Sequence, residues 1–159
     1  MTKSISCIAL VAILLTGLGQ AEEIKPIVKK DDKVVASYPL TTCVISKEKL
    51  GEMGKPIVLD HQGREVQLCC KECIAEFKKD PSSSLAILDA AVIAQQGSSY
   101  PLDTCVVSKE KLGDHGKVVD HVYKNRLIRF CCKACLKDFN ADPEKFLKLI
   151  DEAAAKKKS

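Results

Sequence analysis

The sequence predicts an α+β protein made of two tandem small units, each a loop, a β-hairpin and two helices. The first observation is a repeat: the stretch that begins Tyr38-Pro-Leu returns as Tyr100-Pro-Leu, 62 residues later. A repeat at fixed spacing marks the folding unit, and here the unit is about 55 residues long. The second and third observations are turn residues between β-prone runs and an Asp-Pro pair late in each copy.

The first copy spans residues 38–95. Residues 41–51 predict a tight loop, and the β-prone runs 56–60 and 64–68 predict a hairpin about residues 61–63. In the second copy, residues 100–155, the corresponding runs are 118–122 and 126–130 about residues 123–125. Gly63 aligns with Asn125, and both residue types tolerate the positive φ that a hairpin turn requires.

Helical spacing follows each hairpin. Over residues 70–79 one face collects the side chains of Cys70, Cys73, Ile74 and Phe77. Asp80-Pro81 and Asp142-Pro143 then place an acidic N-cap before a proline, which is a strong helix start. We therefore expect second helices over residues 81–94 and 143–155.

The N-terminus predicts export. Residues 1–21 combine Lys3, an apolar run over 5–15 and small residues at a cleavage position, Gly19-Gln20-Ala21, as secretory signal peptides do. The run is too short to span a bilayer, so we expect a periplasmic or secreted protein without a membrane span after cleavage. An uncleaved anchor is the alternative. Residues 22–37 are interpreted as a flexible leader, 96–99 as a linker and 156–159 as a basic tail.

Composition excludes several functions. The formal charge is +4, with acidic and basic residues interleaved and no basic stripe with aromatics, which argues against nucleic-acid binding. No Ser/His/Asp set, phosphate-cradling glycine loop or carboxylate pair is present, so we predict that the chain is not an enzyme. Each unit is small and has few aromatic residues, so it needs an internal staple.

The cysteines supply the predicted staple and site. Cys43 lies in the first loop, Cys69 at the end of a strand and Cys73 one turn into a helix whose N-terminus stabilises thiolates. Thiolates are the ligands that soft and borderline transition metals need, so the pattern predicts zinc or copper binding. The candidate metal ligands are Cys43, Cys69, Cys70, Cys73, Cys105, Cys131, Cys132 and Cys135.

These residues resemble a known family. Cys43, then Cys69-x-x-x-Cys73, Phe77 and Asp80-Pro81 are similar to the TRASH/YHS-type heavy-metal-binding domain. The second copy matches it with Cys105, Cys131, Cys135, Phe139 and Asp142-Pro143. The resemblance implies a treble-clef-like fold, a transition metal held by three cysteines, and a role in metal sensing, trafficking or resistance. The chain departs from the family at Cys70 and Cys132, where serine is frequent, and lacks the tripeptide that names the YHS domain.

Two other functions stay open on the sequence. An exported small protein with an even cysteine count is typical of a disulfide-stapled interaction module without metal. Cys70-x-x-Cys73 after a strand also resembles a thiol–disulfide exchange motif, although the unit is too short for a thioredoxin sheet. The candidate partners are the metal ion, in the metal-binding interpretation, and an unidentified envelope protein. The three histidines occupy non-equivalent positions in the copies and are interpreted as surface loop residues.

Overall fold

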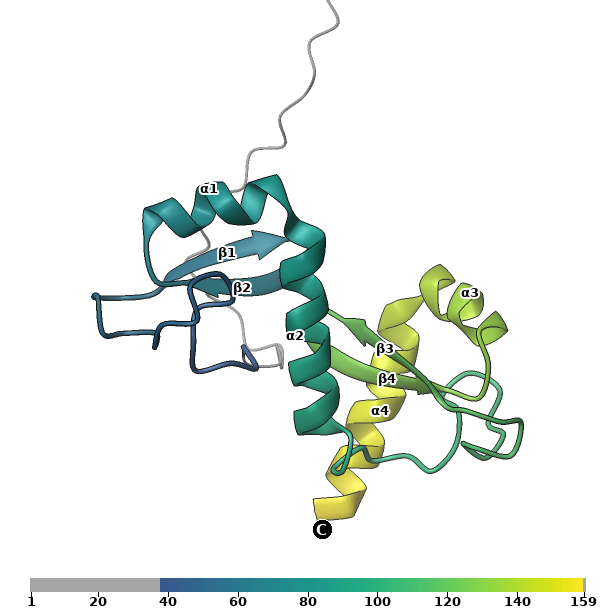
Figure 1. Cartoon of the computed structure of the whole chain (residues 1–159). Coiled ribbons are helices and arrows are strands. Elements are labelled where there is room, and N and C mark those ends of the chain that lie inside the picture. The colour runs from purple at the N-terminus through teal and green to yellow at the C-terminus, as the bar shows by residue number, and fades with distance from the viewer. Residues whose placement is uncertain (1–37, 159) are drawn as a thin grey trace, which may run out of the picture.

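The structure is a computed structural model that describes residues 38–158; the predicted signal peptide and leader lie outside the described residues. It contains two similar units, each with a loop, a two-stranded antiparallel hairpin and two helices (Figure 1), which confirms the predicted α+β class. The first unit contains β1 (Ile57–His61), β2 (Arg64–Leu68), α1 (Lys71–Lys79) and α2 (Pro81–Gln96). The second contains β3 (Val119–Tyr123), β4 (Arg126–Phe130), α3 (Ala134–Ala141) and α4 (Pro143–Lys158). In the described part of the chain, no helix is long and apolar enough to cross a bilayer.

Both hairpins turn over two residues rather than three. Gln62 and Gly63 have φ of 54° and 78°, and Lys124 and Asn125 have φ of 49° and 59°. Left-handed conformations at both central positions define the turn that suits the twist of a hairpin. The positive φ expected at Gly63 and Asn125 is confirmed. Because each turn is tighter than predicted, the first strand of each hairpin ends one residue later than predicted, and it also starts one residue later.

The helix starts lie where the Asp-Pro pairs predict them. The Asp80 carboxylate accepts a hydrogen bond from the backbone N–H of Ser83 at 3.2 Å, and Asp142 accepts one from Lys145 at 3.3 Å. Both bonds satisfy N–H groups that a helix leaves unpaired in its first turn. The helices run further than expected, α2 to Gln96 and α4 to Lys158, so residues 156–158 of the predicted tail are helical.

Each unit has its own core between the hairpin and the helices. Phe77 of α1 and Phe139 of α3 are fully buried and occupy equivalent positions. In the second unit the ring of Phe139 packs against those of Tyr123, Phe130 and Phe146, with centroid separations of 5.5, 5.5 and 5.9 Å. The helix that carries the last cysteine is thereby fixed against its hairpin.

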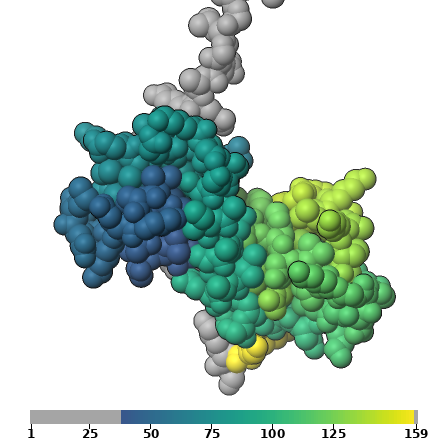
Figure 2. All heavy atoms as spheres, viewed as in Figure 1, coloured from purple at the N-terminus to yellow at the C-terminus, as the bar shows by residue number. Residues whose placement is uncertain are grey.

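The two units also pack on each other. Helix α2 of the first unit contacts β3 and β4 of the second, and the space-filling view shows the units in contact along this helix (Figure 2). The shared apolar cluster is formed by Val92, Tyr100 and Leu127, all buried. The short connector therefore joins two units that each have a core of their own and also share a third apolar cluster.

Asn125 provides a buried polar contact between the units. Its side chain is fully buried, and its Nδ2 donates to the backbone oxygen of Glu65 at 2.8 Å. Its Oδ1 accepts from Nε of Arg64 at 3.2 Å. Arg64 also forms an ion pair with Asp89 of α2 at 2.7 Å. These hydrogen bonds connect the turn of the second hairpin to strand β2 of the first hairpin.

Asn125→Gly is expected to lower the free energy of unfolding by about 1–3 kcal/mol, because it leaves buried partners unsatisfied. Glycine keeps the positive φ at no cost, so Asn125→Ala should be worse by about 1 kcal/mol. Urea unfolding measures both variants. A loss below about 0.5 kcal/mol for Asn125→Gly, the range of ordinary surface substitutions, would show that the bonds between units contribute nothing.

Candidate metal centre

The first loop holds Cys43 in a closed turn. The N–H of Cys43 donates to Glu48 O at 2.7 Å, and the N–H of Lys47 donates back to Cys43 O at 3.0 Å. Lys47 has φ of 68°, and its Nζ donates to Val44 O at 2.8 Å. The second unit repeats these bonds about Cys105, with Lys109 at φ of 67°. This network fixes the position of the first thiol in each unit.

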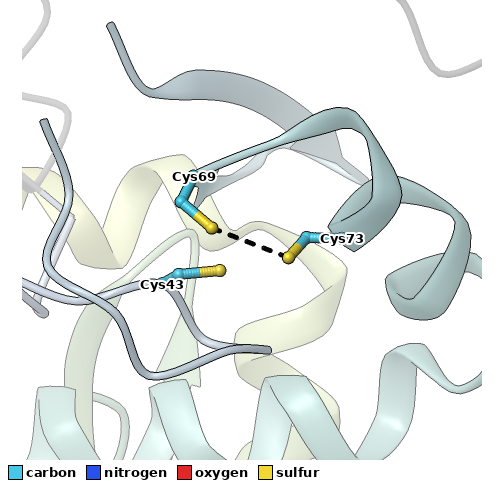
Figure 3. Close-up of side chains that lie close together, drawn as sticks. All are labelled: Cys43, Cys69 and Cys73. Carbon is cyan, nitrogen blue, oxygen red and sulfur yellow. Dashed lines mark hydrogen bonds between the residues drawn. The ribbon is translucent and has the colours of Figure 1, made fainter. Parts of the chain in front are cut away.

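The hairpin and the following helix bring the other two sulfurs to the loop. Cys69 directly follows β2, and Cys73 lies in the first turn of α1. Cys43, Cys69 and Cys73 are 0, 8 and 5% exposed, and their Sγ atoms lie within 4.8 Å of one another. Figure 3 shows the three sulfurs facing a common space. The second unit brings Cys105, Cys131 and Cys135 together within the same limit.

The sulfur separations match a metal site. Two sulfurs, each about 2.3 Å from a tetrahedral zinc ion, lie about 3.8 Å apart. The Sγ atoms of Cys69 and Cys73 are 3.7 Å apart, and those of Cys131 and Cys135 are 3.8 Å apart. These separations are too long for a disulfide bond, and all eight cysteines among residues 38–158 are free thiols. Each unit thus contains three sulfurs placed to bind a metal ion.

The fourth thiol of each unit lies beside this group and not within it. Cys70 Sγ is 3.4 Å from Cys73 Sγ, and Cys132 Sγ is 3.8 Å from Cys135 Sγ. Neither sulfur lies within 4.8 Å of all three members of its group. Cys70 is half-buried and Cys132 is exposed. The candidate site is therefore a set of three sulfurs with one more accessible sulfur at its edge.

Sequence reasoning missed the polar groups around these sulfurs. Ser46 Oγ lies 3.2 Å from Cys69 Sγ, and Ser108 Oγ lies 3.3 Å from Cys131 Sγ. The Cys131 thiol also donates to Glu110 Oε2 at 3.3 Å. The Ser-Lys-Glu-Lys segment that supplies these groups is identical in both copies, and that identity was the available signal.

The loop cysteines are the most acidic thiols of the two groups. Burial opposes ionisation of Cys43, but hydrogen bonds outweigh it and lower its pKa to about 6. The bonds come from the Ser46 hydroxyl and from backbone N–H groups of Ser46, Cys69 and Ile45. Cys105 shows the same balance: burial opposes ionisation, while bonds led by those from Ser108 lower its pKa to about 7. Each loop thus offers a thiolate near neutral pH.

The pKa values of the helix cysteines are shifted in the opposite direction, upward. Burial, reinforced by hydrogen bonds to the neighbouring thiols, raises the pKa of Cys73 far above its usual range. The same causes raise the pKa of Cys135 to about 12. The pKa values of Cys69 and Cys131 are also raised, although hydrogen bonds from Ser46 and Ser108 oppose the increase. One thiolate and two protonated thiols therefore face each other in each group.

Metal binding should release a number of protons that depends on pH. At pH 8 the loop thiols are ionised, so two bound metal ions displace about four protons per chain, two from each unit. As the pH falls through about 7 and then 6, Cys105 and Cys43 become protonated. Proton release should then rise to about six. Calorimetric zinc titrations in buffers of different ionisation enthalpy measure this number, and a constant value of six from pH 5 to 8 would contradict the assignment.

The histidine interpretation is wrong for two of the three residues. His61 lies in β1 with its ring against Phe77 at 5.4 Å, and His121 lies in β3 against Phe139 at 5.9 Å. Both histidines therefore lie in strands, with their rings against a helix, and not in surface loops. His115 stays exposed, with Nε2 at 3.5 Å from Glu110 Oε1. None of the three belongs to either cysteine group.

Comparisons with known proteins provide no relative: no protein-family model, curated protein or solved structure significantly matches this chain. The resemblance to TRASH/YHS-type domains therefore stays a prediction. The geometry supports the coarser statement that the chain is a cysteine-rich protein with two groups of thiols positioned for a metal ion.

Proposed function

We propose that this chain is an exported, non-enzymatic metal-binding protein that holds one thiophilic transition metal ion in each unit. Cys43, Cys69 and Cys73 bind the first ion, and the equivalent three cysteines bind the second. The observation that carries the proposal is the meeting of three buried sulfurs from a loop and a helix start, formed twice. Three buried sulfurs at separations that match a tetrahedral zinc site are the donor set that a thiophilic metal ion uses.

Zinc and copper are the metals that the ligand set favours. Three thiolates plus an outside ligand satisfy tetrahedral zinc, and three thiolates alone satisfy Cu(I). Bound metal would staple the loop to the helix in a unit with a small core, which is a structural role. The signal-like residues 1–21 and the TRASH-type motif support capture or trafficking of the metal in the cell envelope, with a role in resistance or delivery to a partner.

The test is elemental analysis and thiol mapping on one sample purified under reducing conditions. We expect about two metal ions per chain, after supply of zinc or Cu(I) if needed. Alkylation mapped by mass spectrometry should modify Cys70 and Cys132 and spare the six grouped cysteines. No retained or acquired metal under these conditions would reject the proposal. A parallel sample prepared without reductant that shows paired cysteines and no metal would support the disulfide-stapled module.

A further inference from the structure

The two thiols at the edges of the metal groups have no place in the proposed binding sites. Cys70 Sγ lies 3.4 Å from the ligand cysteine Cys73, and Cys132 Sγ lies 3.8 Å from the ligand cysteine Cys135. The ligand cysteines are 5 and 7% exposed, whereas Cys70 is half-buried and Cys132 is exposed. Each pair therefore joins an inner thiol that binds metal to an outer thiol that a solute can reach.

We propose that each pair is a redox-controlled release device. Oxidation joins Cys70 to Cys73, or Cys132 to Cys135, in a disulfide that withdraws one of the three sulfurs and releases the metal ion. This inference rests on the proposed function, because it concerns regulation of the same sites. It predicts a protein that holds metal under reducing conditions and releases it when small disulfides accumulate.

The geometry allows the disulfide with little movement. A disulfide needs an S–S distance of about 2.05 Å, so each pair must close by about 1.5 Å, which side-chain rotation can supply. Residues three apart across a helix start lie on the same side of the helix. The pairs are therefore in position before any oxidant arrives.

The competing pair in each unit is disfavoured by access. Cys69 and Cys131 are as close to the inner thiol, at 3.7 and 3.8 Å, but they are only 8 and 4% exposed. Ser46 and Ser108 also contact these sulfurs and hold them toward the loop. A small disulfide therefore meets the outer thiol first.

The reaction balances as two thiol–disulfide exchanges. The Cys132 thiolate attacks one sulfur of a small disulfide RSSR, forming Cys132–S–SR and releasing RS⁻. The Cys135 sulfur leaves the metal and attacks Cys132 Sγ, which forms the protein disulfide and releases the second RS⁻. Two protein thiolates are oxidised, one RSSR is reduced to two thiolates, and the metal keeps its oxidation state. Any proton on the reacting thiols passes to solvent.

The two units should differ in sensitivity. Cys132 is exposed, whereas Cys70 is half-buried at the N-cap of α1. Because thiol–disulfide exchange needs access to the attacking sulfur, the second unit should lose its metal first. The chain would then respond to oxidation in two steps.

The experiment titrates the zinc-loaded protein with oxidised glutathione and follows released zinc with a chromogenic chelator. Disulfides are mapped by mass spectrometry after alkylation. We expect the Cys132–Cys135 disulfide with release of the first ion, and the Cys70–Cys73 disulfide with release of the second. In the Cys132→Ser variant, oxidation should release zinc from the first unit and leave it bound in the second. In the Cys70→Ser variant, oxidation should release zinc from the second unit and leave it bound in the first. The double variant should release zinc at least roughly tenfold more slowly than the wild type.

In each single variant the unchanged unit serves as the control, so a loss of zinc binding that is confined to the substituted unit can be detected. Release from the double variant at the wild-type rate, or a mapped Cys131–Cys135 disulfide, would overturn the proposal. Loss of zinc loading in both the Ser and the Ala variants of Cys70 and Cys132 would also overturn it, since these residues would then be ligands. Wild-type protein without bound zinc before oxidation would instead contradict the proposed function, whereas zinc that stays bound after oxidation contradicts only this inference.

Discussion

Replacing Cys43 with Ser is expected to reduce the bound metal from two ions to one per chain. Cys43 supplies the only sulfur that the loop contributes to the first group, and it is fully buried. Its loss should weaken zinc or Cu(I) binding in that unit by more than about 100-fold, since even residues behind the ligands contribute 10–100-fold. Competition with a chelator of known affinity, followed by elemental analysis, measures the effect.

Matched variants separate ligand loss from unfolding. Cys105→Ser should remove the other ion, and the double variant should bind neither. Cys43→Ala tests whether a serine hydroxyl acts as a weak substitute ligand. If Cys43→Ser still binds two ions with unchanged affinity, the loop does not contribute to the site and the three-sulfur assignment is wrong.

Phe139→Ala is expected to lower the free energy of unfolding by about 3–5 kcal/mol, the usual cost of deleting a buried aromatic ring. Phe139 is fully buried and its ring packs against Tyr123, Phe130 and Phe146. The same helix carries Cys135, so the second unit should also bind metal more weakly. Urea unfolding with and without zinc measures both effects.

Ile87→Ala provides the control, because this apolar side chain is 40% exposed on α2 and lies outside the three buried apolar clusters. It should change the free energy of unfolding by about 0.5 kcal/mol or less. Equal losses for Phe139→Ala and Ile87→Ala would show that the ring does not position α3. A stability loss that leaves zinc affinity of the second unit intact would separate the core from the metal site.

The gathering of Cys43, Cys69 and Cys73 could be predicted from the sequence because local signals place each of them. A turn, a strand end and a helix start are defined within a few residues, and the second copy repeats them. The boundaries of β1 could not be placed as well. The tight turn needs a left-handed Gln62, and glutamine gives no signal for that conformation.

The packing between units depends on positions where the copies differ. The shared cluster joins Tyr100, which is a tyrosine in both copies, to two residues that differ between the copies, Leu127 and Val92. Their equivalents in the other copy are Glu65 and Ala154. Self-similarity directs attention to what the copies share, so the residues of this interface were not predicted. The positions of Cys70 and Cys132 were not predicted either, because sequence spacing alone does not distinguish a fourth metal ligand from a thiol that lies beside the site.

X-ray absorption at the zinc edge of the loaded protein tests the central claim most directly. The account predicts about three sulfurs per zinc at about 2.3 Å, with one lighter atom, and the same spectrum for the Cys70→Ser/Cys132→Ser double variant. A first shell of nitrogen and oxygen only, or four sulfurs that become three in the double variant, would contradict it.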